Sequence, residues 1–166
     1  MLKYMLYMRN LYKDWRLNML LRKVHLSDCE TLFRWINDME VRKNARYTDV
    51  VSIEDFTDRF NKELENENVY SFIVEKDSVS IGQIKLSKDE ERVVFNYSVD
   101  KNYRGQGLGT EIVKQGEKFA KSNINNINKL VAYVRGSNKG SCKIFENLNY
   151  TIAFSNDDYV IYEKNI

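Results

Sequence analysis

Residues 101–111 read KNYRGQGLGTE, and the spacing of their glycines decides the fold of the chain. Gly105, Gly107 and Gly109 fall at alternate positions, after the apolar run 92–99 and before a helix-like run. A glycine has no Cβ, so three of them leave the backbone bare and free to take conformations that other residues avoid. Since the whole chain holds only 7 glycines, this concentration marks the loop as a place where a bare backbone is needed.

A helix that starts directly after such a loop favours an anion. Its first N–H groups have no partner within the helix, and the helix dipole is positive at that end. Arg104 adds a cation beside the loop. A Walker loop is excluded because GxxxxGK[ST] is absent, and a dinucleotide fingerprint is incomplete because Thr110 stands where its last glycine belongs. The stretch therefore indicates a phosphate-type anion site or, alternatively, a tight strand-to-helix turn whose glycines serve packing.

Outward from the loop, the period of the apolar residues predicts an α+β fold with a mixed, mostly antiparallel sheet. The step from strand 92–99 through helix 107–122 to strand 130–135 is a βαβ unit, so these two strands should be parallel neighbours. Short turns separate the three strands before the loop and indicate an antiparallel meander. In chain order we expect a strand at 19–25, helices at 29–39 and 52–65, strands at 70–75, 79–86 and 92–99, a helix at 107–122, a strand at 130–135, a helix at 139–148, and strands at 150–154 and 158–163.

The composition is that of one globular domain. The chain has 166 residues, 43% of them hydrophobic and 30% charged, with a formal net charge of +2. No block of Lys and Arg points to nucleic acid, and no apolar run reaches the roughly 20 residues that cross a bilayer. Two distant cysteines and a single histidine favour a reducing cytoplasm and argue against a disulfide scaffold or a metal site. We expect a single domain at 19–166, preceded by an N-terminal extension at 1–18.

The loop resembles the (Q/R)-x-x-G-x-(G/A) signature of the GNAT N-acetyltransferases, with Arg104, Gly107 and Gly109 at its fixed points. Downstream, residues 138–150 read NKGSCKIFENLNY, which is similar to the family's second block, N-xx-(A/S)-xxx-(Y/F)-E-xxx-(F/Y). The two blocks stand in the family's order, and the resemblance covers roughly residues 19–163. It implies a GNAT-like sheet with helices on both faces and acetyl-coenzyme A as cosubstrate, without a metal.

The resemblance assigns this cosubstrate to a groove where the family's fourth and fifth strands separate. The loop would hold the pyrophosphate, strand 92–99 would pair with the pantetheine arm, and an amide of Ser98 or Val99 would polarise the thioester carbonyl. Asn138 would hydrogen-bond the arm, cap its own helix, or do both. The implied contacts are Tyr97, Ser98, Val99, Arg104, Gly105, Gln106, Gly107, Leu108, Gly109, Thr110, Asn138, Ser141 and Phe145.

For catalysis, the amine must arrive unprotonated and the sulfur must leave with a proton. Many members of the family use a glutamate base and a tyrosine acid, and this chain departs from both. Phe145 replaces the tyrosine, and Tyr133 stands at the glutamate position of some relatives. The base is therefore water, Tyr133, Tyr97 or Asp38, and the acid is Ser141 or water; each side chain also has an alternative role in packing or at the surface.

Residues 33–45, FRWINDMEVRKNA, carry the clues to the acceptor. The pattern F-x-W-x-N-D-x-x-V-R resembles two branches of the family, one acting on nucleotide-linked amino sugars and one on the N-termini of ribosomal proteins. In the family this segment walls the acceptor site, so the resemblance implies substrate contacts from Trp35, Asn37, Asp38, Arg42 and Asn44. Alternatively, Trp35 belongs to the core and the polar residues form the end of a helix.

The leading hypothesis is an acetyl-coenzyme A-dependent N-acetyltransferase that acts on a small primary amine, first of all an amino-sugar nucleotide. We expect it to act in the cytoplasm as a monomer or homodimer, without nucleic acid or membrane as partners. Three alternatives stay open: an N-terminal protein acetyltransferase, a non-catalytic coenzyme A-binding module, and a structural domain with no ligand at the loop.

Overall fold

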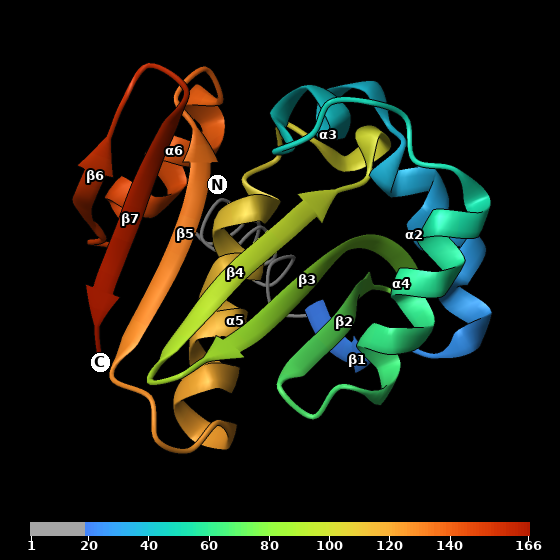
Figure 1. The fold of residues 1–166 in the computed structure, drawn as a ribbon, viewed down its shortest axis with the longest axis horizontal. Helices are drawn as coiled ribbons and strands as arrows, with labels where there is room; N and C mark the ends of the chain where they lie inside the picture. Colours follow the sequence, from blue (N-terminus) through green and yellow to red (C-terminus); the bar gives the residue numbers. More distant parts are fainter. Residues whose placement is uncertain (1–18) are drawn as a thin grey trace, which may run out of the picture.

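A computed structural model describes residues 19–166 of the chain. Its central element is a β-sheet (Figure 1). The predicted extension at 1–18 lies outside the described residues. Residues 19–166 form one seven-stranded sheet with the strand order β1-β2-β3-β4-β5-β7-β6. Its strands are β1 (Met19–Lys23), β2 (Val69–Lys76), β3 (Val79–Asp89), β4 (Arg92–Val99), β5 (Lys129–Arg135), β6 (Thr151–Ser155) and β7 (Tyr159–Asn165).

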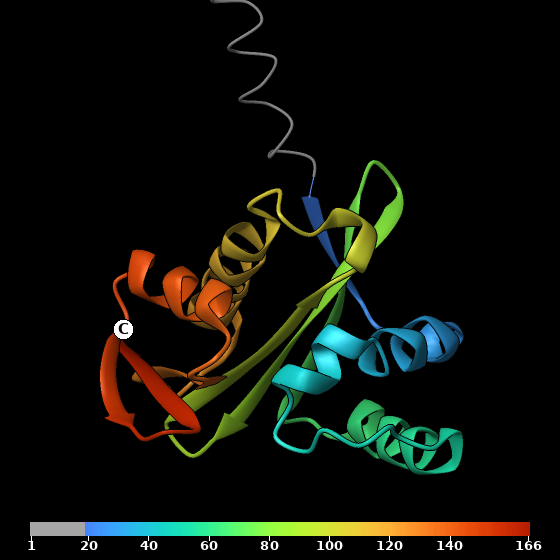
Figure 2. The same cartoon turned by 90° about the horizontal axis from the view of Figure 1, so that it is seen from above.

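Helices cover both faces of this sheet (Figure 2). One face carries α5 (Leu108–Asn123) and α6 (Lys139–Asn147), and the other carries α2 (Cys29–Ile36), α3 (Met39–Asn44) and α4 (Ile53–Glu65). Short 3-10 turns, η1 (Leu26–Asp28) and η2 (Lys101–Tyr103), precede α2 and the glycine loop. No helix within residues 19–166 has the length and apolarity needed to span a membrane.

The strand pairing opens the sheet at one point. Neighbouring strands are antiparallel except β4 and β5, which run parallel as the βαβ step predicts. Their register starts at Arg92 opposite Lys129 and ends at Phe95 opposite Ala132. Both strands continue beyond this pair without facing each other, so the sheet splits between residues 96–99 of β4 and 133–135 of β5.

Side chains alternate between two cores because successive residues of a strand point to opposite faces. Phe72 and Val74 of β2 join the large core beneath α5 and α6, whereas Ile73, which is fully buried, joins a smaller core with Trp35 and Phe60. The small core attaches α2 and α4 to the sheet, and it thereby fixes the wall on which the predicted acceptor residues lie.

The α+β class, the mixed sheet and the element order are confirmed, and one element was predicted wrongly. The helix expected at 29–39 ends at Ile36, and a separate helix, α3, begins at Met39. Asp38 causes the break, because its extended backbone (ψ 137°) leaves the helical region and its carboxylate accepts the amides of Glu40 and Val41. An aspartate in this role is a strong N-cap, and it starts a new helix rather than continuing the old one.

Candidate active site

A cavity of about 950 Å³ lies where the sheet splits. Residues 96–99 of β4 and 132–135 of β5 form two of its sides. The glycine loop and α6 close the end next to α5, and the helices α2, α3 and α4 form the opposite wall. The split thus connects the predicted anion loop with the predicted acceptor wall in one continuous space.

Two of the three loop glycines serve backbone conformation. Gly105 and Gly107 have φ values of 76° and 73°, in the left-handed region that L side chains rarely adopt. No atom lies within 4 Å of the position that a Cβ would take at either residue, so the space above them is open. Gly107 is the N-cap of α5 and offers no side-chain cap, which leaves the first amides of this 16-residue helix available to an anion.

The third glycine serves close packing. A Cβ on Gly109 would lie 2.8 Å from Ile144 Cδ1 and 3.3 Å from Tyr97 Cε2. The neighbouring Leu108 is buried in the large core and anchors the start of α5. Gly109 therefore lets α5, α6 and β4 meet directly beneath the loop. At this one position, the glycine serves packing, which was the alternative interpretation of the loop glycines.

A hydroxyl pair lies below the loop. The Tyr97 hydroxyl donates to Ser141 Oγ at 3.1 Å, and the Ser141 amide donates to Asn138 Oδ1 at 3.1 Å, so Asn138 caps α6. Burial raises the pKa of the Tyr97 hydroxyl, and the hydrogen bond to Ser141 only partly offsets this. The Tyr97 hydroxyl therefore stays protonated, so it donates a hydrogen bond to Ser141 and cannot act as a base. Phe145 is buried against the ring of Tyr97, with centroids 6.2 Å apart.

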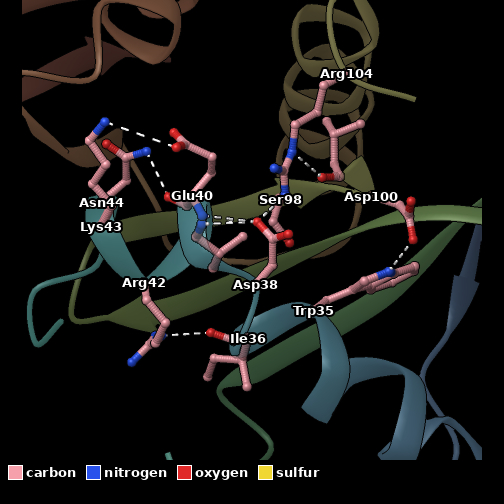
Figure 3. Close-up of polar contacts among 12 residues, drawn as sticks. Trp35, Ile36, Asp38, Glu40, Arg42, Lys43, Asn44, Ser98, Asp100 and Arg104 are labelled. Carbon is pink, nitrogen blue, oxygen red and sulfur yellow. Dashed lines mark hydrogen bonds and ion pairs between the residues drawn. The ribbon is translucent and has the colours of Figure 1, made fainter. Parts of the chain in front are cut away.

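Arg104, which lines the cavity, pairs with Asp38, which does not (Figure 3). Arg104 Nη2 lies 2.6 Å from Asp38 Oδ1, and Arg104 Nε donates to the Val99 carbonyl at 3.0 Å. Burial alone would raise the pKa of Asp38, but the hydrogen bonds from Arg104 and from the amides of Val41 and Glu40 outweigh it and lower that pKa. A carboxylate held ionised in this way is a weak base, and it links the acceptor wall to the glycine loop.

Trp35 also makes an internal contact. Its indole Nε1 donates to Asp100 Oδ2 at 2.7 Å, and both side chains are buried (Figure 3). The other oxygen of Asp100 accepts the Asn102 amide at 2.9 Å and caps the turn η2. Trp35 therefore fixes the start of the segment that leads into the glycine loop, while its ring belongs to the small core.

The remaining polar residues of the wall hold the chain between α2 and α4. Asn37 makes two bonds with the backbone of Val51, at 2.9 and 2.8 Å. Arg42 donates to the carbonyls of Ile36, Tyr47 and Asp49, at 2.6, 3.1 and 3.1 Å. Asn44 donates to the carbonyl of Glu40, which lies one turn earlier in α3. Of these three predicted substrate residues, Arg42 and Asn44 line the cavity and Asn37 does not.

The other predicted site residues differ in how close they lie to the cavity. Tyr133 of β5 lines it and is 50% exposed, beyond the point where β5 leaves β4. Ser98 lines it from β4 and accepts a long hydrogen bond from Gln83. Gln106 and Thr110 belong to the loop and the first turn of α5 but are not among the lining residues.

Several charged residues that line the cavity were not predicted from the sequence. Arg59 and Glu63 lie on α4, Lys85 on β3, and Arg135 on β5. Glu63 pairs with Lys85 at 2.6 Å, while Arg135 donates to the Ala45 carbonyl at 2.8 Å and so ties β5 to the acceptor wall. The signal available was the spacing of Arg59 and Glu63, which places both on one face of helix α4. Within residues 19–166, no three His, Cys, Asp or Glu side chains gather where they could hold a metal ion.

Comparison with known proteins gives consistent matches. The family model described as "Acetyltransferase (GNAT) domain" matches residues 18–151. The uncharacterised N-acetyltransferase p20 of Bacillus licheniformis is 27% identical over 151 residues, which cover 86% of this chain and 83% of the relative.

Solved structures share the fold. Spermidine N-acetyltransferase from Vibrio cholerae, in complex with CoA and spermine, has a TM-score of 0.77 at 16% identity and covers 89% of this chain and 95% of that one. RimL, a ribosomal alpha-N-protein acetyltransferase in complex with coenzyme A, has a TM-score of 0.74 at 15% identity, with coverages of 90% and 94%.

Proposed function

The chain belongs to the GNAT acetyltransferase family and is an N-acetyltransferase, and on that premise we propose that it transfers the acetyl group of acetyl-coenzyme A to a primary amine. The observation that carries the proposal is the loop at Gly105 and Gly107, whose left-handed backbone opens onto a cavity at the split between β4 and β5. The two cysteines of the chain, Cys29 and Cys142, are free thiols, which suits a protein that acts in the reducing cytoplasm.

The residues present fit the donor. The open space above Gly105 and Gly107 admits a pyrophosphate against the first amides of α5, where a side chain would stand in its way. The stretch of β4 at 96–99 is paired with β3 but not with β5, so on its open side it offers backbone groups to an extended arm, as an edge strand does. We assign the amide of Ser98 or Val99 to the thioester carbonyl, where a fixed N–H would stabilise developing negative charge.

Acetyl-coenzyme A supplies the acetyl group as a thioester, so a C–N bond forms, the C–S bond breaks, and one proton passes from the amine side to the sulfur. We assign Ser141 as the proton donor: it gives its proton to the sulfur and takes one back from water in the cavity. Its oxygen already accepts the Tyr97 hydroxyl, so its own hydrogen remains free to point into the cavity. Tyr97 acts on the reaction through Ser141 and is a positioning residue.

We assign the amine proton to water in the cavity, oriented by the Tyr133 hydroxyl. Tyr133 reaches the cavity from β5 on the opposite side of the split from Ser98. Asp38 is unsuited to this role because its ion pair with Arg104 keeps its pKa low. The ion pair of Asp38 and Arg104 instead holds the acceptor wall and the glycine loop together.

The charges of the cavity favour an anionic acceptor. The charged residues lining it are Arg42, Arg59, Lys85, Arg104, Arg135 and Lys143 against Glu40 and Glu63. A polyamine would bring several positive charges into this predominantly basic space and be repelled. An amino-sugar nucleotide, which carries an amine and a diphosphate, suits the balance of charge and stays our leading acceptor, and a protein N-terminus is the rival.

The donor assignment is tested with two substitutions whose side chains have nearly the same shape, Gly107→Asp and Gly107→Asn. Both residues tolerate the left-handed backbone, so the pair differs mainly in charge. In calorimetric titrations with acetyl-coenzyme A, we expect the wild type to bind, Gly107→Asn to bind more weakly, and Gly107→Asp to lose binding, because its carboxylate would face the pyrophosphate.

Equal affinities for acetyl-coenzyme A in the two folded variants would overturn the donor assignment. A screen of amines at saturating acetyl-coenzyme A then identifies the acceptor. Turnover of amino-sugar nucleotides supports the leading acceptor, whereas turnover of a peptide panel without any amino sugar would replace it with the N-terminal protein acetyltransferase.

A further inference from the structure

The wall formed by α3 and α4 carries two arginines on the acceptor side of the cavity. We propose that Arg42 and Arg59 form a subsite for the diphosphate of a nucleotide-linked amine, held apart from the donor's own pyrophosphate at the glycine loop. This inference rests on the proposed function and adds to it a location for the acceptor's anionic group.

Arg42 is preorganised for such a role. Its Nε and Nη1 donate to three carbonyls, those of Ile36, Tyr47 and Asp49, so the plane of the guanidinium is fixed. Its Nη2 donates to no group within residues 19–166. A fixed guanidinium with one free terminal nitrogen loses little entropy when it binds an oxyanion.

Arg59 supplies the second cation. It lies on the exposed side of α4, where its Nε donates to the Asp55 carbonyl at 3.2 Å, and its two terminal nitrogens have no partner among residues 19–166. Neither arginine forms an ion pair with a carboxylate in the described part of the chain. Both side chains line the same cavity, Arg42 from α3 and Arg59 from α4. Burial, and after it the positive charge of Arg59, lower the pKa of Arg42.

The acids of the same wall do not neutralise this pair. Glu63, one turn after Arg59 on α4, is engaged with Lys85 at 2.6 Å. Glu40 is 59% exposed and faces Lys43. Two guanidinium groups without a carboxylate partner on one cavity wall favour a diphosphate, because Arg59 can donate two parallel hydrogen bonds from its terminal nitrogens to one phosphate and Arg42 can donate from Nη2 to the other.

The position of the pair suits an acceptor. Arg42 lies in α3, whose N-cap Asp38 contacts Arg104 of the donor loop. An anion held at Arg42 and Arg59 therefore occupies the same cavity as the split between β4 and β5, on the side away from α5 and α6. The amine of a nucleotide-linked sugar can then extend from this wall toward the split.

The test uses the full chain saturated with coenzyme A, so that the glycine loop is occupied, and inorganic pyrophosphate as a probe free of any base. The variant is Arg59→Gln, since Arg42 also holds three carbonyls and its loss would disturb the fold. The matched control is Lys62→Gln, which removes one positive charge from the same helix at an exposed position outside the cavity.

We expect the wild type and Lys62→Gln to bind pyrophosphate, with an affinity that falls as salt rises, and Arg59→Gln to bind about tenfold more weakly or worse. With a uridine diphosphate-linked amino sugar as acceptor, Arg59→Gln should raise the KM for the acceptor and leave the KM for acetyl-coenzyme A unchanged.

Equal pyrophosphate affinities for Arg59→Gln and Lys62→Gln would overturn the subsite, as would a wild type that binds coenzyme A but not pyrophosphate. Coenzyme A binding is measured first in the same samples. Its failure would overturn the proposed function, and the contrast between the two variants would still decide whether the arginine pair binds a diphosphate.

Discussion

The cavity has two ends that are built in opposite ways: the donor end at the glycine loop and the acceptor end at residues 33–45. At the donor end, the glycine loop presents bare backbone, with Gly105 and Gly107 open to the cavity. At the acceptor end, the polar side chains of 33–45 mostly contact other parts of the protein: Trp35 bonds Asp100, and Asn37 bonds Val51. The donor end is therefore ready to receive a ligand, while much of the acceptor wall serves its own architecture.

A polar motif beside a candidate active site therefore does not by itself indicate substrate contact. A buried polar group must find a partner within the protein or lose stability, and the wall's side chains have found theirs. The polar groups of Trp35 and Asn37 are engaged within the protein in this way, so their contact with substrate stays a prediction. What is left for the acceptor are the groups with free donors, Arg42 Nη2 and the end of Arg59.

The largest effect is expected from Asp100→Ala, which should break the link between the two ends. Asp100 accepts the Trp35 indole and the Asn102 amide, so its loss leaves two donors without partners next to the core. We expect the free energy of unfolding to fall by about 3 kcal/mol, measured by urea denaturation. Both KM values should rise, because the segment at 101–107 is no longer fixed.

Trp35→Phe is the control for Asp100→Ala, since it keeps the aromatic volume and removes only the indole N–H. A loss of about 1–2 kcal/mol, with the KM of the acceptor little changed, would agree with an architectural Trp35. If Trp35→Phe leaves stability unchanged but raises the acceptor KM strongly, the ring contacts substrate and the contrast between the two ends fails.

The sequence predicted the backbone elements around the glycine loop well because their signals are local. A glycine in the left-handed region before a helix and a βαβ step are both set by neighbours in the chain, so the loop, α5 and the parallel pair of β4 and β5 could be anticipated. The splitting of these strands came from the family resemblance, and the register, which ends at Phe95 and Ala132, agrees with it.

The acceptor wall was harder to predict because its partners are distant in sequence or lie in irregular segments. Trp35 and Asp100 are 65 residues apart, and Arg42 binds carbonyls of a loop that has no periodicity. The helix break at Asp38 had a local signal, Asn-Asp before a new polar–apolar pattern, but the apolar spacing of 32–39 concealed it. Arg59 was missed because a single arginine on an amphipathic helix looks like ordinary solvent-facing charge.

The second largest effect is expected on kcat, at the hydroxyl pair of Tyr97 and Ser141. Ser141→Ala removes the proposed proton donor, and we expect kcat to fall about a hundredfold, the lower range for general acid catalysis, with both KM values nearly unchanged. Tyr97→Phe should reduce kcat less, because it removes only the hydrogen bond that orients Ser141. Steady-state kinetics over a pH series measure both variants.

A Ser141→Ala enzyme with wild-type kcat would show that water supplies the proton. Should Tyr97→Phe prove slower than Ser141→Ala, the roles of the two hydroxyls would have to be exchanged. Either result would leave the glycine loop as the donor site, since neither hydroxyl contributes to the loop's backbone amides.

The smallest effect is expected at the ion pair of Asp38 and Arg104 between the two ends, and its size depends on pH. Asp38 has a folded-state pKa below its ordinary value, owing to Arg104 and the α3 amides, which outweigh burial. It therefore stabilises the fold above the unfolded-state pKa of roughly 4, and this contribution is lost as pH falls through the lower folded-state pKa. Asp38→Asn keeps a good N-cap while removing the charge.

At pH 7 we expect Asp38→Asn to lower the free energy of unfolding by about 1 kcal/mol, because the pair it breaks is partly exposed, at 19% for Asp38 and 32% for Arg104. The difference from wild type should shrink below pH 4, whereas Glu40→Gln, which loses a 4.0 Å contact with Lys43, should match wild type throughout. Urea denaturation at several pH values measures this. A difference that stays constant with pH would show that the pKa of Asp38 is not lowered in the folded chain and that the ion pair adds no stability. Among residues 19–166, the contact of Trp35 with Asp100 would then be left to join the two ends of the cavity.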